Sequence, residues 1–349
     1  MKMTFRWYGD SDPVTLSHIR QIPTITGIVS AVYDTAPGSV WSEASIASIR
    51  EKAQKNGLEF EVVESVPVPE DIKLGNEKAP ALIANYCENI RRLGKAGVKC
   101  ICYNFMPVFD WLRSELEHVQ ADGANALAYD EQTVLSMNPL TSELSLPGWD
   151  ASYTKEGLRE LLQQYAANTE EDLWHNLQTF LEAVVPVAEE SGVKLAIHPD
   201  DPPWGLFGLP RIITNEQNLE RFLQLVDSPA NGLTFCTGSL GADVHNDLPR
   251  MIRRFGKRIY FAHLRNIRHT GERRFEEVGH PTSCGSLDML EIVKALVESG
   301  FDGYVRPDHG RMIWGETGRY GYGLFDRALG ATYLAGLFEA VEDAAKPKA

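Results

Sequence analysis

The sequence EESGVKLAIHPDD, residues 189–201, runs from the end of an amphipathic helical pattern through Gly192 into a short apolar stretch that stops at His198. A glycine directly after a helix is typical of the left-handed residue that ends the helix. The same order of helix, glycine and strand recurs at Gly57, Gly97 and Gly300. Strands that alternate with helices in this way favour parallel βαβ units.

Short β-branched runs and longer helical patterns alternate along the whole chain. We expect strands at residues 4–8, 27–33, 59–66, 98–104, 193–198, 232–236, 259–263 and 303–308. We expect helices at residues 42–56, 77–96, 170–190, 286–298 and 324–342. Eight such units predict a closed (β/α)8 TIM barrel, with residues 1–349 as a single domain. The alternative, a doubly wound sheet, usually carries a glycine-rich phosphate loop after its first strand, and residues 8–13 (YGDSDP) do not form one.

One connection is much longer than the ~2–6 residues of an ordinary strand–helix loop. Residues 105–168 follow the fourth predicted strand, and we expect them to form an insertion at the carboxyl end of the barrel. Its stretch at 110–120, which contains Leu and Trp, indicates a helix, whereas 138–150 is rich in turn-forming residues. The insertion is predicted to be a lid, an arm of an oligomer or a solvent-facing excursion. Residues 346–349 are expected to be a loose tail.

Charge and composition exclude several classes of protein. The chain has 349 residues, of which 43% are hydrophobic and 23% charged, as in an ordinary globular enzyme. Its formal net charge of −14 makes nucleic acid and acidic membrane surfaces poor partners. No stretch approaches the ~20 apolar residues of a membrane span, and we expect no signal peptide at the amino terminus. Five irregularly spaced cysteines favour reduced thiols and a cytoplasmic location.

Metal-competent side chains end four consecutive predicted strands, whereas we expect none of the other four strands to end in a charged pair. In a barrel these ends meet at one rim, so the four side chains are predicted to converge. A lone strand histidine is more often a core residue, and a lone buried cysteine usually packs as a small hydrophobic residue. The coincidence of four nevertheless favours a metal centre made by His198, Cys236, His263 and Asp308. Two imidazoles, a thiolate and a carboxylate suit zinc or divalent iron or cobalt.

Groups suited to proton transfer lie next to these positions. His309 follows Asp308 directly, and an imidazole works as acid or base near neutral pH. Arg306 shares the face of Asp308 by strand alternation, so it would bind an anionic substrate or form a structural ion pair. Tyr320 and Tyr322 lie in a glycine-flanked loop that either reaches over the mouth or packs on the surface. We expect core packing for Cys100 and Cys102, and helix, loop or surface positions for His18, His118, His175, His245, His269 and His280.

Long motifs spread along the chain resemble those of the mannonate dehydratase family. They are RWYG (6–9), YNFMPVFDW (103–111), HPDDPP (198–203), FCTGS (235–239), HLRN (263–266), RPDHG (306–310) and GYGL (321–324). The resemblance implies a xylose-isomerase-like barrel that depends on Mn²⁺. It implies that the metal ligands are His198, Cys236, His263 and Asp308, and that His309 and Tyr322 transfer protons.

The reaction implied by this resemblance converts D-mannonate to 2-dehydro-3-deoxy-D-gluconate in hexuronate breakdown. Arg306, Arg265, Asn104 and Trp7 are the implied substrate-binding residues, and local positive charge at the mouth must outweigh the overall negative charge. Which of His309 and Tyr322 is the acid stays open, as does a role for Tyr320. A metal-dependent sugar isomerase or epimerase on the same barrel is the nearest alternative, and a non-catalytic sugar-acid sensor is another. A homo-oligomer is also expected.

Overall fold

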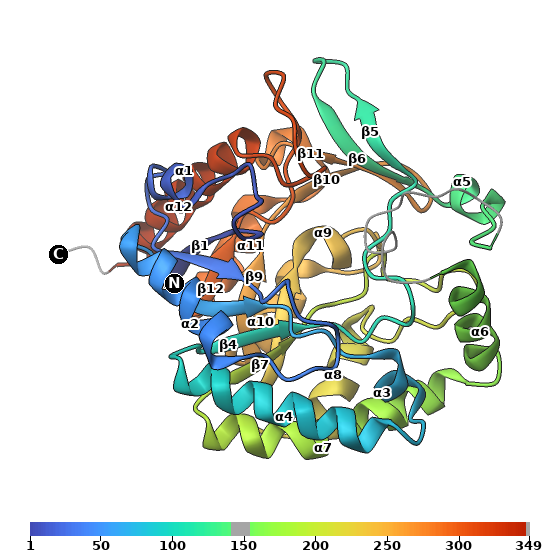
Figure 1. Cartoon of the computed structure of the whole chain (residues 1–349). Coiled ribbons are helices and arrows are strands. Elements are labelled where there is room, and N and C mark those ends of the chain that lie inside the picture. Colours follow the sequence, from blue (N-terminus) through green and yellow to red (C-terminus); the bar gives the residue numbers. More distant parts are fainter. Residues whose placement is uncertain (141–153, 347–349) are drawn as a thin grey trace.

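Eight parallel strands close into a barrel with the order β1-β12-β9-β8-β7-β4-β3-β2 (Figure 1). The computed structural model describes residues 1–140 and 154–346. The strands are β1 (Lys2–Arg6), β2 (Gly27–Ser30), β3 (Glu59–Glu64), β4 (Cys100–Tyr103), β7 (Lys194–Ile197), β8 (Asn231–Cys236), β9 (Ile259–His263) and β12 (Tyr304–Arg306). Each of the eight predicted strands overlaps one of these, so the predicted barrel is confirmed.

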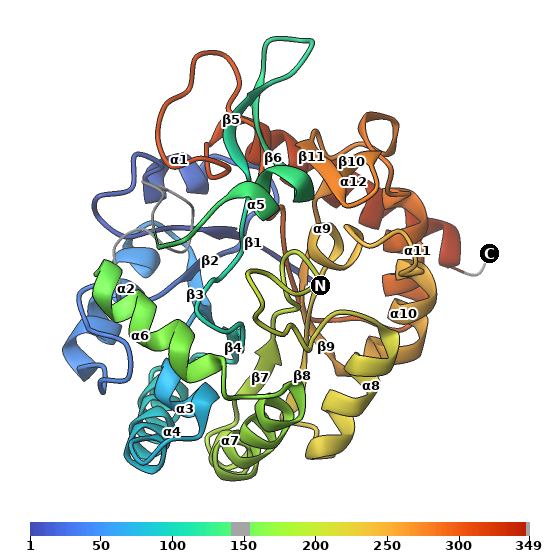
Figure 2. The same ribbon diagram turned by 90° about the vertical axis from the view of Figure 1, so that its right-hand side faces the viewer.

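Helices surround the barrel, and Figure 2 looks into it with the helices arranged around the strands. They are α1 (Leu16–Arg20), α2 (Glu43–Lys55), α3 (Glu70–Leu74), α4 (Ala79–Lys95), α7 (Glu170–Glu190), α8 (Glu216–Leu225), α9 (Thr237–Leu240), α10 (Leu248–Phe255), α11 (Met289–Glu298) and α12 (Phe325–Ala345). Two 3₁₀ turns lie at Gly256–Arg258 and Thr282–Cys284. The four glycines predicted to follow helices all have positive φ angles, between 65° and 93°, as the left-handed conformation requires.

Apolar side chains on the two faces of the barrel strands form two cores. The strand residues that point outward pack against the helices in one large cluster. The inward-pointing residues form a smaller cluster of Val29, Val62, Cys100, Cys102, Ala196 and Phe261. The alternation of Cys100 and Cys102 with buried outward-facing residues confirms that these two thiols share one face of β4, as expected for a strand.

The helix predicted at 110–120 is wrong, because part of this stretch forms the strand β5 (Glu115–Val119). Its residues alternate between exposed and half-buried positions, which is the period of a strand and not of a helix. β5 pairs antiparallel with β6 (Asn125–Asp130). The signal was the alternation in Glu-Leu-Glu-His-Val, which Trp111 and Leu112 upstream obscured.

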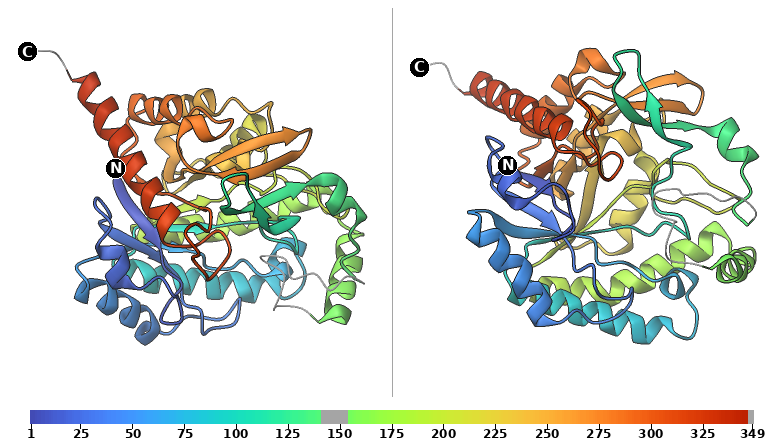
Figure 3. Two further views of the ribbon diagram at one scale, coloured as in Figure 1. Left: turned by 90° about the horizontal axis from the view of Figure 1, so that it is seen from above. Right: turned by 45° about the horizontal axis from the view of Figure 1, so that its top comes forward.

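The insertion after β4 pairs with a second segment that leaves the barrel, which follows β9 and is called the second excursion. This excursion is the hairpin of β10 (Asn266–Gly271) and β11 (Arg274–Val278), and it was not predicted. β11 pairs antiparallel with β6, which makes a four-stranded sheet in the order β10-β11-β6-β5. Figure 3 shows the two hairpins side by side above the barrel. The barrel therefore carries an antiparallel sheet that is built from two segments far apart in the sequence.

The remainder of the insertion contributes two helices, α5 (Glu131–Ser136) and α6 (Lys155–Tyr165). Leu158, Leu161 and Tyr165 of α6 pack with Val108 and Phe109 in a small separate cluster. The turn-rich stretch predicted at 138–150 lies outside the described residues from 141 onward, as does the tail from 347.

All five cysteines are free thiols. Across residues 1–140 and 154–346, the helices are too short or too polar to cross a membrane.

Truncation of Phe261 tests whether the barrel interior is packed as described. Its side chain is fully buried in the inner cluster, so Phe261→Ala should lower the free energy of unfolding by about 3–5 kcal/mol. Leu135→Ala is the control, because that side chain is 69% exposed and its loss should cost less than about 0.5 kcal/mol. Urea unfolding measures both values, and equal small losses would contradict the packed interior.

Candidate active site

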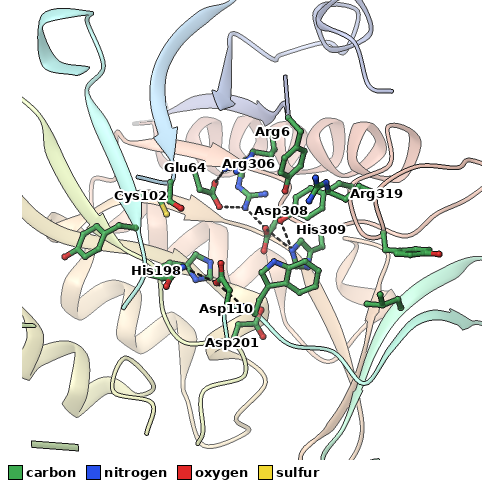
Figure 4. A pocket seen from close by; sticks show the side chains of 18 of the residues that line it. Arg6, Glu64, Cys102, Asp110, His198, Asp201, Arg306, Asp308, His309 and Arg319 are labelled. Atoms are coloured by element: carbon green, nitrogen blue, oxygen red, sulfur yellow. Dashed lines mark hydrogen bonds and ion pairs between the residues drawn. The ribbon is translucent and has the colours of Figure 1, made fainter. Parts of the chain in front are cut away.

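A cavity of about 530 Å³ opens at the carboxyl ends of the barrel strands. Figure 4 shows side chains from several strands and loops pointing into it. The last residues of β1, β3, β4 and β12 all line the cavity. Its lining residues are Arg6, Tyr8, Glu64, Ser65, Cys102, Tyr103, Asn104, Asp110, Trp111, Leu116, His198, Asp201, Arg306, Asp308, His309, Gly318, Arg319, Tyr320 and Tyr322.

His198, Cys236 and His263 bring their ligand atoms within 4.8 Å of one another. Nε2 of His198 lies 3.1 Å from Nδ1 of His263. Nδ1 of His198 lies 2.7 Å from the carbonyl of Pro199, so it donates there and leaves the lone pair of Nε2 facing the cluster. Ser239 donates to the sulfur of Cys236 over 3.0 Å. These donors fit a divalent cation.

Asp308 adjoins this cluster but is also held by two arginines. Its Oδ2 lies 3.3 Å from the sulfur of Cys236, and its Oδ1 lies 3.8 Å from Nδ1 of His263. Arg306 pairs with Oδ1 at 2.8 Å, and Arg265 pairs with Oδ2 at 2.7 Å. Burial opposes ionisation, but these two guanidinium groups hold the pKa of Asp308 well below its usual value. The carboxylate is therefore charged and lies where a fourth ligand is needed.

A second cluster of metal-competent atoms consists of Glu64, Cys102 and His263. We expected only core packing for Cys102, yet it also lines the cavity. Glu64 already pairs with Arg306 at 2.8 Å, and a cation there would meet that guanidinium. Burial also raises the pKa of the Cys102 thiol well above its usual value, whereas a metal ligand must be a thiolate. The first cluster is thus the better cation site.

His309 and Tyr322 meet directly at the side of the cavity. Nε2 of His309 lies 3.0 Å from the hydroxyl of Tyr322. Burial raises the pKa of Tyr322 well above its usual value, so the phenol stays protonated. Tyr8 packs edge-on against Tyr322, with 4.9 Å between ring centroids, and the ring of Trp111 lies 4.6 Å from that of His309. The arrangement suits proton exchange within a desolvated pair.

Behind His309 lies a buried cluster of Arg113, Arg265, Asp201 and Glu277. Asp201 pairs with Arg113 at 2.8 Å and with Arg265 at 2.6 Å. Glu277 pairs with Arg113 at 2.7 Å, with Arg265 and with Nδ1 of His309 at 2.9 Å. Burial alone would raise the pKa of Glu277, but Arg265, His309 and Arg113 lower it to about 2.

The predicted substrate-binding residues divide into two groups. Arg306 and Asn104 line the cavity. Arg265 and Trp7 are not among the lining residues, because Arg265 is enclosed by carboxylates and Trp7 is packed in the outer core. Tyr320 lines the mouth but is 38% exposed.

Several cavity residues were missed by the strand-end argument. We expected no charged pair at the ends of the other four strands. However, Arg6 ends β1 and Glu64 ends β3, and Nη1 of Arg6 lies 3.2 Å from Oε2 of Glu64. The strands predicted at 4–8 and 59–66 run two residues past the ends of β1 and β3, so their last residues were not these two. His280 was expected in a polar loop, yet it is 1% exposed and hydrogen-bonds to the carbonyl of Pro307.

The expected excess of positive charge at the mouth is not supplied by the lining side chains. Three arginines face four carboxylates there, so the lining carries one net negative charge. A divalent cation would reverse that sign, which an anionic ligand needs.

Comparisons with known proteins agree on one family. The family model described as D-mannonate dehydratase (UxuA) matches residues 1–348. Mannonate dehydratase 2 of Halalkalibacterium halodurans is 55% identical over 98% of this chain and 99% of its own length. Mannonate dehydratase of Streptococcus uberis is 54% identical over 99% of this chain and 100% of its own length.

Solved structures show the same relationship. The crystal structure of mannonate dehydratase from Streptococcus suis serotype 2 superposes with a TM-score of 0.91 and 47% identity. It covers 100% of this chain and 96% of that chain. A D-tagatose 3-epimerase-like protein, at 13% identity and a TM-score of 0.57, covers 99% of this chain and 100% of that chain and shares the fold alone.

The lowered pKa of Glu277 predicts a loss of stability in acid. Folding depresses this pKa from 4.5 to about 2, so the stabilisation is complete above pH 4.5 and disappears as the pH falls toward 2. The contribution is on the order of 3 kcal/mol. Urea unfolding at a series of pH values should show a smaller acid-dependent loss for Glu277→Gln than for the wild type. Identical pH dependences would contradict the assignment.

Proposed function

The chain belongs to the D-mannonate dehydratase family, and from that membership we propose how its cavity carries out the dehydration. The enzyme is a hydro-lyase that removes water from D-mannonate and gives 2-dehydro-3-deoxy-D-gluconate. The observation that carries the proposal is the contact of His309 with Tyr322 beside the cation-competent cluster. We assign the reaction to hexuronate breakdown, as the resemblance implies.

The chemistry sets three demands on the cavity. The proton next to the substrate carboxylate must leave, which places negative charge on that carboxylate and its neighbouring oxygen. The hydroxyl on the adjacent carbon is a poor leaving group and needs a proton. The substrate anion must also be attracted into a cavity whose own side chains carry a net negative charge.

His198, Cys236, His263 and Asp308 would hold the cation that meets the first and third demands. We propose Mn²⁺ as the ion, with Fe²⁺ or Co²⁺ as substitutes and Zn²⁺ less favoured. When bound, the ion neutralises charge on the substrate's oxygens. The hydrogen bond from His198 to the carbonyl of Pro199 orients the imidazole for this role.

His309 and Tyr322 would meet the second demand and accept the proton that leaves. Their contact at 3.0 Å lets one group take a proton while the other gives one. Arg306 would bind a substrate oxygen, because its Nη1 is buried without a hydrogen-bond partner among the described residues. Asn104 also lines the cavity and would bind a substrate hydroxyl. Arg265 and Trp7 would then support the site from outside the cavity.

A metal-dependent isomerase or epimerase is not favoured. The epimerase-like protein shares the barrel at 13% identity, whereas the mannonate dehydratases share more than half of the residues along the whole chain. The homo-oligomer expected from the sequence stays a prediction.

Turnover of D-mannonate is the direct test. Wild-type protein with Mn²⁺ should form a 2-keto-3-deoxy acid that the periodate–thiobarbiturate assay detects. His309→Ala should lose at least about 100-fold in kcat while its metal content stays unchanged, because the imidazole transfers protons without binding the ion. An epimerised aldonate as the sole product would contradict the proposal, and so would full turnover by the variant.

Two cysteine variants distinguish the clusters of metal-competent atoms. Cys236→Ala should lose most bound Mn²⁺, whereas Cys102→Ala should keep it, because only Cys236 belongs to the favoured set. Elemental analysis after dialysis against a fixed Mn²⁺ concentration measures both. If Cys236→Ala kept its bound Mn²⁺ and Cys102→Ala lost it, the cation site would instead be the cluster of Glu64, Cys102 and His263.

A further inference from the structure

We propose that Glu277 is a positioning residue that holds the imidazole of His309 with a proton on Nδ1 and directs Nε2 toward Tyr322 and the cavity. Glu277 lies on β11, outside the barrel, and does not line the cavity. The inference deepens the proposed function and rests on the role given there to His309.

The geometry of the His309 ring carries the inference. Nδ1 lies 2.9 Å from Oε1 and 3.1 Å from Oε2 of Glu277, and both side chains are buried. An ionised carboxylate only accepts hydrogen bonds, so Nδ1 is the donor. A neutral imidazole has one N–H, and Nε2 therefore accepts from the hydroxyl of Tyr322 over 3.0 Å. Glu277 thereby sets which ring nitrogen exchanges protons at the cavity.

Other contacts keep the carboxylate in place. Nη2 and Nε of Arg113 donate to Oε1 of Glu277 at 2.7 and 3.0 Å, and Arg265 donates to the same atom. The side chain of Gln120, next to β5, donates to the backbone carbonyl of Glu277 at 2.9 Å. Both excursions above the barrel thus meet at this residue. The ring of Trp111 covers that of His309, which limits its rotation.

A purely structural role as a counter-charge for the two arginines is the alternative. Asp201 already pairs with both Arg113 and Arg265, so the arginines have a shared carboxylate without Glu277. Among the two acids, Glu277 is the one hydrogen-bonded to the imidazole. A counter-charge role predicts that a folded, metal-loaded variant of Glu277 keeps its turnover, whereas a positioning role predicts that it loses turnover.

Glu277→Gln tests the proposal in the metal-loaded enzyme. The amide keeps the size of the side chain but offers an N–H₂ group to Nδ1, which favours the wrong tautomer of His309. We expect kcat to fall by about 100-fold or more, with KM and bound Mn²⁺ within about threefold of the wild type. Glu276→Gln is the matched control, because the carboxylate of Glu276 binds Arg268 and His118 instead of His309, so kcat should stay within about twofold. A folded, metal-loaded Glu277→Gln enzyme with wild-type kcat would overturn the proposal.

Neutron diffraction of the deuterium-exchanged wild-type enzyme gives a test that needs no variant. A deuteron on Nδ1 of His309, directed at Glu277, is expected whether or not Nε2 also carries one. A bare Nδ1 would overturn the proposal. Failure of the wild type to dehydrate D-mannonate would instead refute the proposed function, so the two failures are distinguishable.

Discussion

Buried pairs of arginine and carboxylate hold the carboxyl end of the barrel together. Arg113, Arg265 and Arg306 are each at most 2% exposed, and each contacts at least two acidic side chains. Loss of one partner in such a network leaves an uncompensated buried charge, which costs about 3–5 kcal/mol. The pair of Arg306 with Glu64 also joins the ends of β12 and β3, which are not neighbours in the barrel. The network also ties the sheet above the barrel to the strands beneath it.

The same network limits where a cation can bind. Glu64 is paired with two arginines, so its oxygens are already neutralised. The cluster around Cys236 has two imidazole nitrogens 3.1 Å apart and a sulfur that accepts a hydrogen bond from Ser239, and Arg306 donates to the other nitrogen of His263, Nε2. Asp308 belongs to both groups of residues, because its carboxylate pairs with Arg306 and also contacts the sulfur of Cys236. A divalent ion here would balance the acidic excess of the cavity wall and make it attractive to an anion.

The barrel and most of its rim were predictable from sequence because the signals are local. A β-branched run followed by a helical pattern and a glycine fixes each strand, and the strand's last residue then follows by counting. His198, Cys236 and His263 were found in this way. Arg6 and Glu64 were missed because the predicted strands at 4–8 and 59–66 run two residues past the ends of β1 and β3.

Glu277 and Arg113 could not be found by such counting. Their contact joins residues 164 positions apart, and it depends on antiparallel pairing between two excursions that no periodicity in the sequence links. The hairpin of β10 and β11 is polar at its exposed edge, so it resembles an ordinary loop in composition. The stretch misassigned as a helix at 110–120 contains β5, which pairs with β6, the strand that in turn pairs with β11.

The barrel strands and the two excursions contribute different parts of the site. Parallel strands deliver side chains to a common rim, which suffices to gather the metal-competent atoms. Proton transfer needs more, because the tautomer of His309 must be fixed and its surroundings kept dry. In this chain Trp111 from the first excursion covers the His309 ring, and Glu277 from the second binds its Nδ1. The D-tagatose 3-epimerase-like protein shares the fold alone at 13% identity, and a shared barrel does not determine which groups carry out proton transfer.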